Sequence, residues 1–202
     1  IENGIGNLLD SGSRYGGGII SRNTMLILDS LIIENNESFA GGGVCIYDME
    51  FSNTQSILKN SIIRNNIASE GGGVFVINQS LDIINSTIDE NGMIPFGSGG
   101  GVQALAANLN LLNTSLINNH SRFGGGIYIG SSNSYIEKTI ISNNISDSKG
   151  GGVWAGSDSN VDFSEALITN NFSDGFGGGI FISSSNLMID KSTISSNIVA
   201  SD

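Results

Sequence analysis

A glycine triplet that recurs seven times constrains the fold of this chain more than any other feature. The triplets begin 25 to 30 residues apart, at Gly16, Gly41, Gly71, Gly99, Gly124, Gly150 and Gly177. An asparagine column recurs with the same phase, at Asn36, Asn66, Asn91, Asn119, Asn144, Asn171 and Asn197. Repetition of this kind is the signature of a solenoid, in which each repeat packs only on its neighbours.

An isoleucine column runs beside the asparagines, and we expect it to fill the interior. Its members are Ile33, Ile63, Ile88, Ile117, Ile141, Ile168 and Ile194. Apolar residues within each repeat alternate with the period of a strand, and Gly, Asn and Ser bound them. The period, about 26 residues, is too short for paired-helix repeats of about 33 or more. The Leu-x-x-Leu-x-Leu spacing of leucine-rich repeats is also absent.

These patterns predict an all-β fold, a right-handed single-stranded parallel β-helix of about seven coils with 25–30 residues each. Residues 1–202 are expected to form a single β-helix segment of a larger repeat protein. Within it, 1–15 would form a partial coil and loop, 16–197 the seven repeats, and 198–202 the start of the next turn.

Each column has an expected role at the bends between strands. Asparagine tolerates left-handed backbone, and its amide can bond the amide one coil away. The glycine triplets supply backbone freedom and close approach at another bend. Two insertions, Tyr47–Phe51 and Gly92–Phe96, are expected to form loops, and loops often carry binding residues.

The pairing of Gly-Gly-Gly-(Ile/Val) with Ile-x-x-Asn resembles the repeat of the polymorphic outer-membrane-protein family. More broadly, it is similar to the pectin-lyase-like β-helix proteins. The resemblance covers the chain from about Gly16 to Asn197. It implies a secreted or surface region used in adhesion or in the structure of the cell envelope.

Charge and composition exclude several classes of function. The net charge is −11 and the eight basic residues are scattered, which argues against a nucleic-acid partner. No run of 18 or more apolar residues is present, so no membrane-spanning helix is expected. Cys45 is the only cysteine, and therefore no intrachain disulfide can form.

Catalytic, cofactor and metal sites are not apparent in the sequence, and none is predicted. Asp82, Asp162 and Glu137 are expected on strands, but they form no local cluster of the kind that glycoside hydrolysis requires. We interpret them as surface carboxylates that keep a sparsely charged protein soluble. His120 and Cys45 stand on different repeats and cannot supply the usual ligands of a zinc ion.

The residue between the two apolar positions after each triplet should face outward. In four repeats it is aromatic: Phe75, Tyr128, Trp154 and Phe181. Such a stripe could stack on sugars or dock a partner. The alternative, which we favour, is stacking between coils that stabilises the sheet by about 0.2–1 kcal/mol per pair.

Seven Asn-x-Ser/Thr sequons are present. Four belong to the asparagine column (Asn36, Asn119, Asn144 and Asn171) and cannot carry glycans if they point inward. The other three, at Asn78, Asn85 and Asn113, remain potential acceptors in a glycosylating host.

Three functions are compatible with these features. The first is a non-enzymatic structural or adhesive segment of a secreted or cell-surface protein. The second is an extracellular filament subunit whose coils stack end to end. The third is a carbohydrate-binding or carbohydrate-active β-helix module. The expected partners are accordingly a second copy of the chain, or glycans and proteins of a cell surface.

Overall fold

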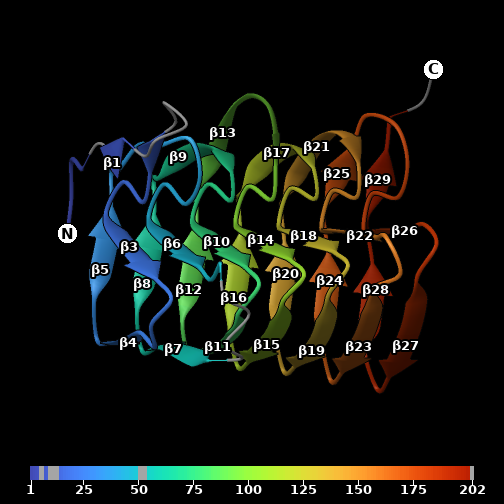
Figure 1. Cartoon of the computed structure of the whole chain (residues 1–202). Coiled ribbons are helices and arrows are strands. Elements are labelled where there is room, and N and C mark those ends of the chain that lie inside the picture. The colour runs from blue at the N-terminus through green and yellow to red at the C-terminus, as the bar shows by residue number, and fades with distance from the viewer. Residues whose placement is uncertain (5–6, 9–13, 50–53, 201–202) are drawn as a thin grey trace.

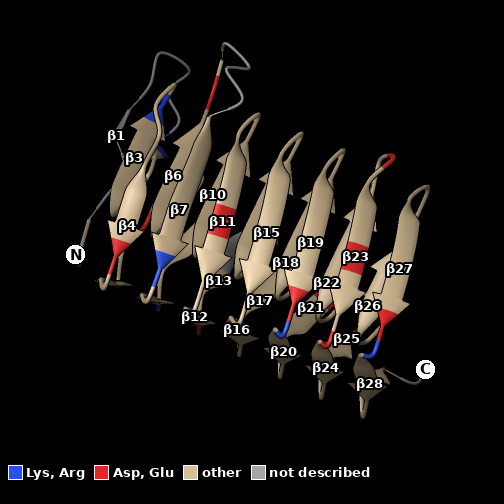
Figure 2. Cartoon of the chain, turned by 90° about the horizontal axis from the view of Figure 1, so that it is seen from below, with Lys and Arg blue, Asp and Glu red and all other residues tan. Residues whose placement is uncertain are grey.

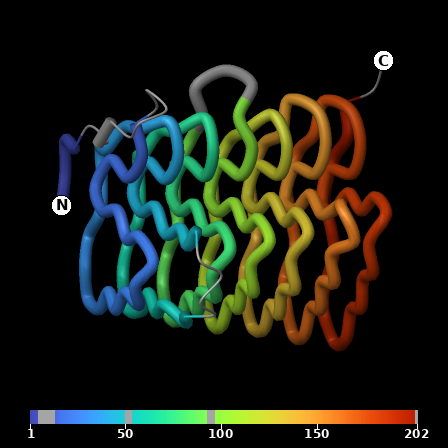
Figure 3. The backbone as a smooth tube through the Cα atoms, in the orientation of Figure 1, coloured from blue at the N-terminus to red at the C-terminus, as the bar shows by residue number. Residues whose placement is uncertain are grey.

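The computed structural model describes residues 1–4, 7–8, 14–49 and 54–200, and the side chains of residues 7–8 and 93–96 are not described. The predicted all-β solenoid is confirmed: parallel sheets stack through about seven turns, with no helix among the described residues (Figure 1). Each turn of the chain lies directly beside the preceding one (Figure 3). The described part accordingly holds no helix that could cross a membrane.

Four parallel sheets, here numbered I to IV in chain order, form the walls of the described solenoid. Sheet I follows the glycine triplets and contains β3 (Ile19–Arg22), β6 (Val44–Tyr47), β10 (Val74–Ile77), β14 (Val102–Leu105), β18 (Ile127–Gly130), β22 (Val153–Gly156) and β26 (Ile180–Ile182). Sheet II contains β4 (Ile27–Asp29), β7 (Gln55–Lys59), β11 (Ser80–Ile84), β15 (Asn108–Leu112), β19 (Asn133–Glu137), β23 (Asn160–Ser164) and β27 (Asn186–Asp190).

The other two sheets close each coil. Sheet III contains β5 (Ile32–Glu34), β8 (Ile62–Arg64), β12 (Thr87–Asp89), β16 (Ser115–Ile117), β20 (Ile140–Ser142), β24 (Leu167–Thr169) and β28 (Thr193–Ser195). Sheet IV contains β9 (Ile67–Glu70), β13 (Gly92–Ser98), β17 (His120–Phe123), β21 (Ile145–Lys149), β25 (Phe172–Ser173) and β29 (Ile198–Val199). A short antiparallel pair, β1 (Asn7–Leu8) with β2 (Arg14–Tyr15), precedes them.

The insertions do not form the predicted loops where they are described, because Tyr47 and Gly92–Phe96 belong to strands. Tyr47 ends β6, Asp48 and Met49 follow it, and the rest of the first insertion lies outside the described residues. The second insertion is part of β13, whose register against β9 shifts between Met93 and Ser98.

The interior column is confirmed in six coils, with one change of residue. Ile33, Ile63, Ile88, Ile141 and Ile168 are fully buried and pair in register along sheet III. Burial of such a side chain contributes about 1.5–3 kcal/mol to folding. A single apolar core therefore runs the length of the solenoid.

The assignment of Ile117 to this column is wrong. Leu116 pairs with Ile88 and Ile141 and is fully buried, whereas Ile117 pairs with Asp89 and Ser142 on the outer side. Successive side chains on a strand point to opposite faces, so a shift of one residue exchanges inside and outside. Two adjacent apolar residues conceal this shift in the sequence.

The final member of the column, Ile194, keeps its register with Ile168 but is 46% exposed. It belongs to the last described coil, where the side chains of β27 to β29 have no further described coil above them. This residue therefore does not fill the interior in the described structure.

The asparagine column forms a continuous ladder of buried carboxamides. Asn144 shows the pattern: its Oδ1 accepts hydrogen bonds from the backbone N–H (2.9 Å) and Nδ2 (3.0 Å) of Asn119. Its Nδ2 donates to Oδ1 of Asn171 (2.9 Å) and to the carbonyl oxygen of Leu116 (3.0 Å). The same bonds link the column from Asn36 to Asn197, so each coil is tied to the coils on both sides.

Left-handed backbone occurs one residue earlier than predicted. The ladder asparagines have ordinary φ values, and the preceding residues take φ near +55°, as Asn65, Asn118 and Asn143 do. The bend thus uses two adjacent residues. The residue with positive φ bends the chain, and the asparagine that follows it points its side-chain amide inward, where it joins the ladder.

The glycine triplets solve two steric problems. The first glycine of each triplet has φ between +58° and +69°, the left-handed region that favours glycine. The next two approach the neighbouring coil too closely for a side chain. A Cβ on Gly100 would lie 2.6 Å from the carbonyl oxygens of both Gly125 and His120.

We predict that Asn144→Ala destabilises the protein by about 3–5 kcal/mol, because it removes four buried hydrogen bonds, among them the bond that the backbone N–H of Asn119 makes. Urea unfolding followed by circular dichroism measures the change. Asn186→Ala, at an exposed asparagine, is the matched control and should cost less than about 1 kcal/mol. Equal losses in the two variants would contradict the stabilising role of the ladder.

We also predict that Gly100→Ala lowers the free energy of unfolding by about 2 kcal/mol or more, since the new methyl group overlaps two carbonyl oxygens. Gly92→Ala provides the control, because no atom lies within 4 Å of the Cβ it would add. Its stability should stay unchanged or rise by up to about 1 kcal/mol. Thermal melts of both variants test the pair, and a harmless Gly100→Ala would refute the close-approach argument.

Candidate functional site

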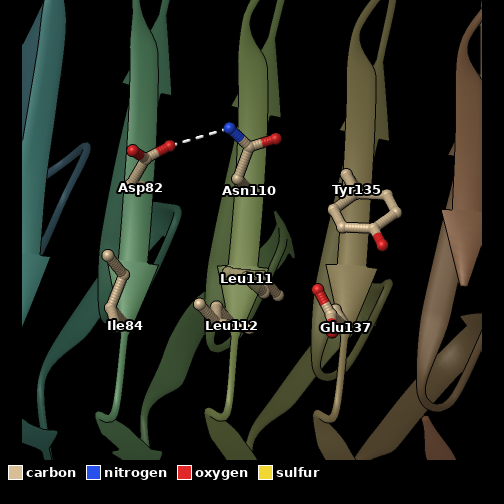
Figure 4. Close-up of a pocket in the computed structure, with 7 residues that line it drawn as sticks. All are labelled: Asp82, Ile84, Asn110, Leu111, Leu112, Tyr135 and Glu137. Atoms are coloured by element: carbon tan, nitrogen blue, oxygen red, sulfur yellow. Dashed lines mark hydrogen bonds between the residues drawn. The ribbon is translucent and has the colours of Figure 1, made fainter. Parts of the chain in front are cut away.

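The strands β11, β15, β19 and β23 lie side by side in sheet II (Figure 2), and its outer face carries two adjoining hollows over them. Figure 4 shows the residues that line one of these hollows. Their volumes are about 330 Å³ and about 440 Å³. Asn110 and Tyr135 line both of them. Strand alternation explains the composition: on β19, Asn133, Tyr135 and Glu137 face outward, whereas the two residues between them are buried.

A row of exposed asparagine amides borders the larger hollow. The Nδ2 of Asn133 donates to Oδ1 of Asn108 (3.3 Å), that of Asn160 to Asn133 (2.8 Å), and that of Asn186 to Asn160 (2.9 Å). Each amide has two N–H donors and an oxygen with two lone pairs. Asn133 and Asn160 therefore each keep one N–H donor and one oxygen lone pair that the bonds of this row do not use.

The carboxylates on this face have different surroundings. Asp82 accepts a hydrogen bond from the side-chain amide of Gln55 at 2.5 Å. It accepts another from the side-chain amide of Asn110 at 2.7 Å (Figure 4). Glu137 forms an ion pair with Lys138, with 3.1 Å between Oε1 and Nζ. That carboxylate raises the pKa of Lys138 and keeps it charged. Asp162, next to Tyr135, has no hydrogen-bond or ion-pair partner among the described side chains.

Tyr135 is the aromatic residue of this face and is 45% exposed. Its register neighbours are Asn110 on one side and Asp162 on the other. Its ring forms no ring pair with another described aromatic side chain. An exposed ring between an amide and a carboxylate can contact both the apolar and the charged parts of a ligand.

The sequence identified the acids of this face but missed the hollow. The register of sheet II places Asp162 between Tyr135 and Met188. The amide row was overlooked, although a signal exists. Asparagine stands at the first position of four successive sheet II strands: Asn108, Asn133, Asn160 and Asn186.

The predicted aromatic stripe does share one column of sheet I, but Phe75 is not exposed. Phe75 is only 6% exposed and packs with Ala40 and Cys45 in a second apolar cluster outside the main core. The partly buried side chains of Tyr15, Tyr47 and Leu105 pack against this cluster.

The rest of the stripe is half-buried and engaged with its neighbours. The rings of Tyr128 and Trp154 stack at 4.2 Å between centroids, 7° from parallel. Phe181 lies under the ammonium group of Lys149, which is 5.0 Å from its ring centroid. Stacking covers one face of each ring in the Tyr128–Trp154 pair, so the geometry supports stabilisation between coils over sugar binding here.

A hydrogen bond between Gln103 and Glu70 lies beside Phe75, because Gln103 is the register neighbour of Phe75 in sheet I. Burial raises the pKa of the Glu70 carboxyl group, and a hydrogen bond from Gln103 partly opposes this shift. The Oε1 atom of Gln103 is buried and has no hydrogen-bond partner among the described residues. Replacement of the charged Glu70 side chain by a neutral one should therefore stabilise the folded protein.

The residues that could hold a metal lie apart. His120 bonds the carboxylate of Asp147 at 2.6 Å on the surface of sheet IV. Cys45 is fully buried in sheet I, where burial raises the pKa of its thiol to about 12. The described residues contain no group of three or more His, Cys, Asp and Glu side chains that could hold a metal ion.

Comparison with known proteins finds no matching family model, no matching curated protein and no matching solved structure.

We predict that Glu70→Gln raises the melting temperature at pH 7 by about 2 °C or more. The folded-state pKa of Glu70 is raised above its ordinary value of 4.5, so stability is greatest below that value and falls as pH rises through the raised pKa. The advantage of the variant should therefore shrink as the pH falls to about 4.

Thermal melts across this pH range test the prediction. Glu37→Gln, at an exposed position, is the control and should show no such pH-dependent gain. An equal gain at pH 4 and pH 7 for Glu70→Gln would contradict the role of burial.

Proposed function

We propose that this chain is a non-enzymatic structural and adhesive segment of a secreted or cell-surface protein, which binds its partner on the outer face of sheet II. The observation that carries the proposal is the pair of hollows around Tyr135, built on strands rather than loops. A site on paired strands is held more precisely than one on loops.

The scaffold suits a load-bearing or displaying role. The strands β11, β15, β19 and β23 pair over five residues each without a break in register. The exposed asparagines at the start of β15, β19 and β23 consequently recur from coil to coil at about 4.8 Å. A partner with its own repeat can make many weak contacts along such a face, and linked weak contacts give strong overall binding.

The state of the carboxylates favours binding over catalysis. Glycoside hydrolysis uses two carboxyl groups about 5–10 Å apart on either side of the scissile bond. Asp82 is held by two amides, and Glu137 is paired with Lys138. Asp162 and Glu137 lie on neighbouring strands, offset by two residues on the same flat face. This arrangement places them side by side instead of on opposite sides of a ligand.

Adhesion of protein-coated beads tests the proposal. We expect beads carrying residues 1–202 to attach to surfaces coated with mixed cell-surface glycans, and Tyr135→Ala to reduce attachment severalfold. Asp174→Asn, at an exposed acid away from sheet II, should leave attachment unchanged. Absence of attachment by the wild-type chain, or glycan cleavage by it, would overturn the proposal.

A further inference from the structure

The hollows on sheet II differ in chemistry across their width. Asn133 and Asn160 present amide groups at one edge, and the Tyr135 ring lies in the middle. Glu137 follows Tyr135 on the same strand and borders the opposite edge (Figure 4). Asp162 flanks the ring on the neighbouring coil. A ligand that fits this order needs hydroxyl groups at one side, an apolar C–H face in the middle and a positive charge close to the ring and the acid.

The amide edge is suited to hydroxyl groups. The ladder bonds use one donor and one lone pair of Asn133 and of Asn160. The remaining N–H donors and lone pairs of these amides can bond hydroxyls, which donate and accept in the same way. Successive amides one coil apart offer such pairs at a regular spacing of about 4.8 Å.

The negative charge of this face favours a ligand that carries a positive charge. Asp162 is not neutralised by any described cation, and the chain carries a net charge of −11. Lys138, which follows Glu137 in the chain, is already paired with that carboxylate. A carboxylate-bearing ligand would be repelled here, whereas an ammonium group would be attracted by Asp162 and by the face of the Tyr135 ring.

We infer that the outer face of sheet II binds an oligosaccharide of amino sugars with free ammonium groups. An ammonium group lies between Asp162 and the Tyr135 ring, the C–H face of the sugar covers the ring, and its hydroxyls bond the amides of Asn133 and Asn160. The inference rests on the proposed adhesive function and specifies the ligand of its site. A basic peptide supplies the charge but lacks the hydroxyls, so the amide edge favours the sugar.

Calorimetry with four probes tests the ligand class. The probes are a β-linked glucosamine tetramer, its fully N-acetylated form, a galacturonate tetramer and a lysine tetrapeptide. We expect the glucosamine tetramer to bind at least about tenfold more tightly than each of the others. Binding should also weaken as salt increases, because the charges are exposed. Equal binding of the N-acetylated sugar or of the peptide would overturn the inference.

Two pairs of variants test the site. Asp162→Asn and Tyr135→Ala should each weaken glucosamine binding about tenfold, whereas Asp174→Asn and Tyr135→Phe should retain it. Unchanged melting temperatures show that the variants fold. Undiminished binding by Asp162→Asn or Tyr135→Ala would overturn the inference.

The two proposals fail separately. Beads that attach through Tyr135 without any affinity for the glucosamine tetramer would refute the amino sugar and leave the adhesive function standing. Beads that do not attach at all would refute the adhesive function itself.

Discussion

The buried carboxamide ladder is the interaction on which the rest of the structure depends. Each ladder asparagine bonds a backbone N–H, a backbone carbonyl and two neighbouring amides, in an interior where the loss of a hydrogen bond is costly. The ladder also fixes the phase of every coil, because an amide must face the amide above and below it. Once that phase is set, the apolar columns, the glycine bends and the outward side chains all fall into register.

The sequence predicts the solenoid well because its repeats encode both bends. It misplaces Ile117 because Leu116 and Ile117 are both apolar, and only the distance to Asn119 distinguishes inside from outside. It also misjudges Phe75, since strand alternation indicates which way a side chain points but not which other side chains cover it. The hollows around Tyr135 escape prediction for a related reason. They arise from side-chain sizes in neighbouring coils, which a single repeat does not contain.

Aromatic side chains have different surroundings on the outer faces of sheet I and sheet II. On sheet I, Tyr128 and Trp154 are register neighbours, and their rings stack on each other. On sheet II, Tyr135 stands between an amide and a carboxylate and has an exposed ring. The residues of the neighbouring coils therefore determine whether an aromatic ring on these two sheets is stacked or exposed.

The inward direction of the ladder amides has a consequence for biosynthesis. Asn36, Asn119, Asn144 and Asn171 each belong to a glycosylation sequon, yet their side chains are buried in the finished coil. In a compartment that attaches sugars to asparagine, the rate at which each coil folds would compete with the rate at which the enzyme attaches a glycan. A glycan added first would block the coil permanently, and the order of two events on the emerging chain would decide whether the molecule matures.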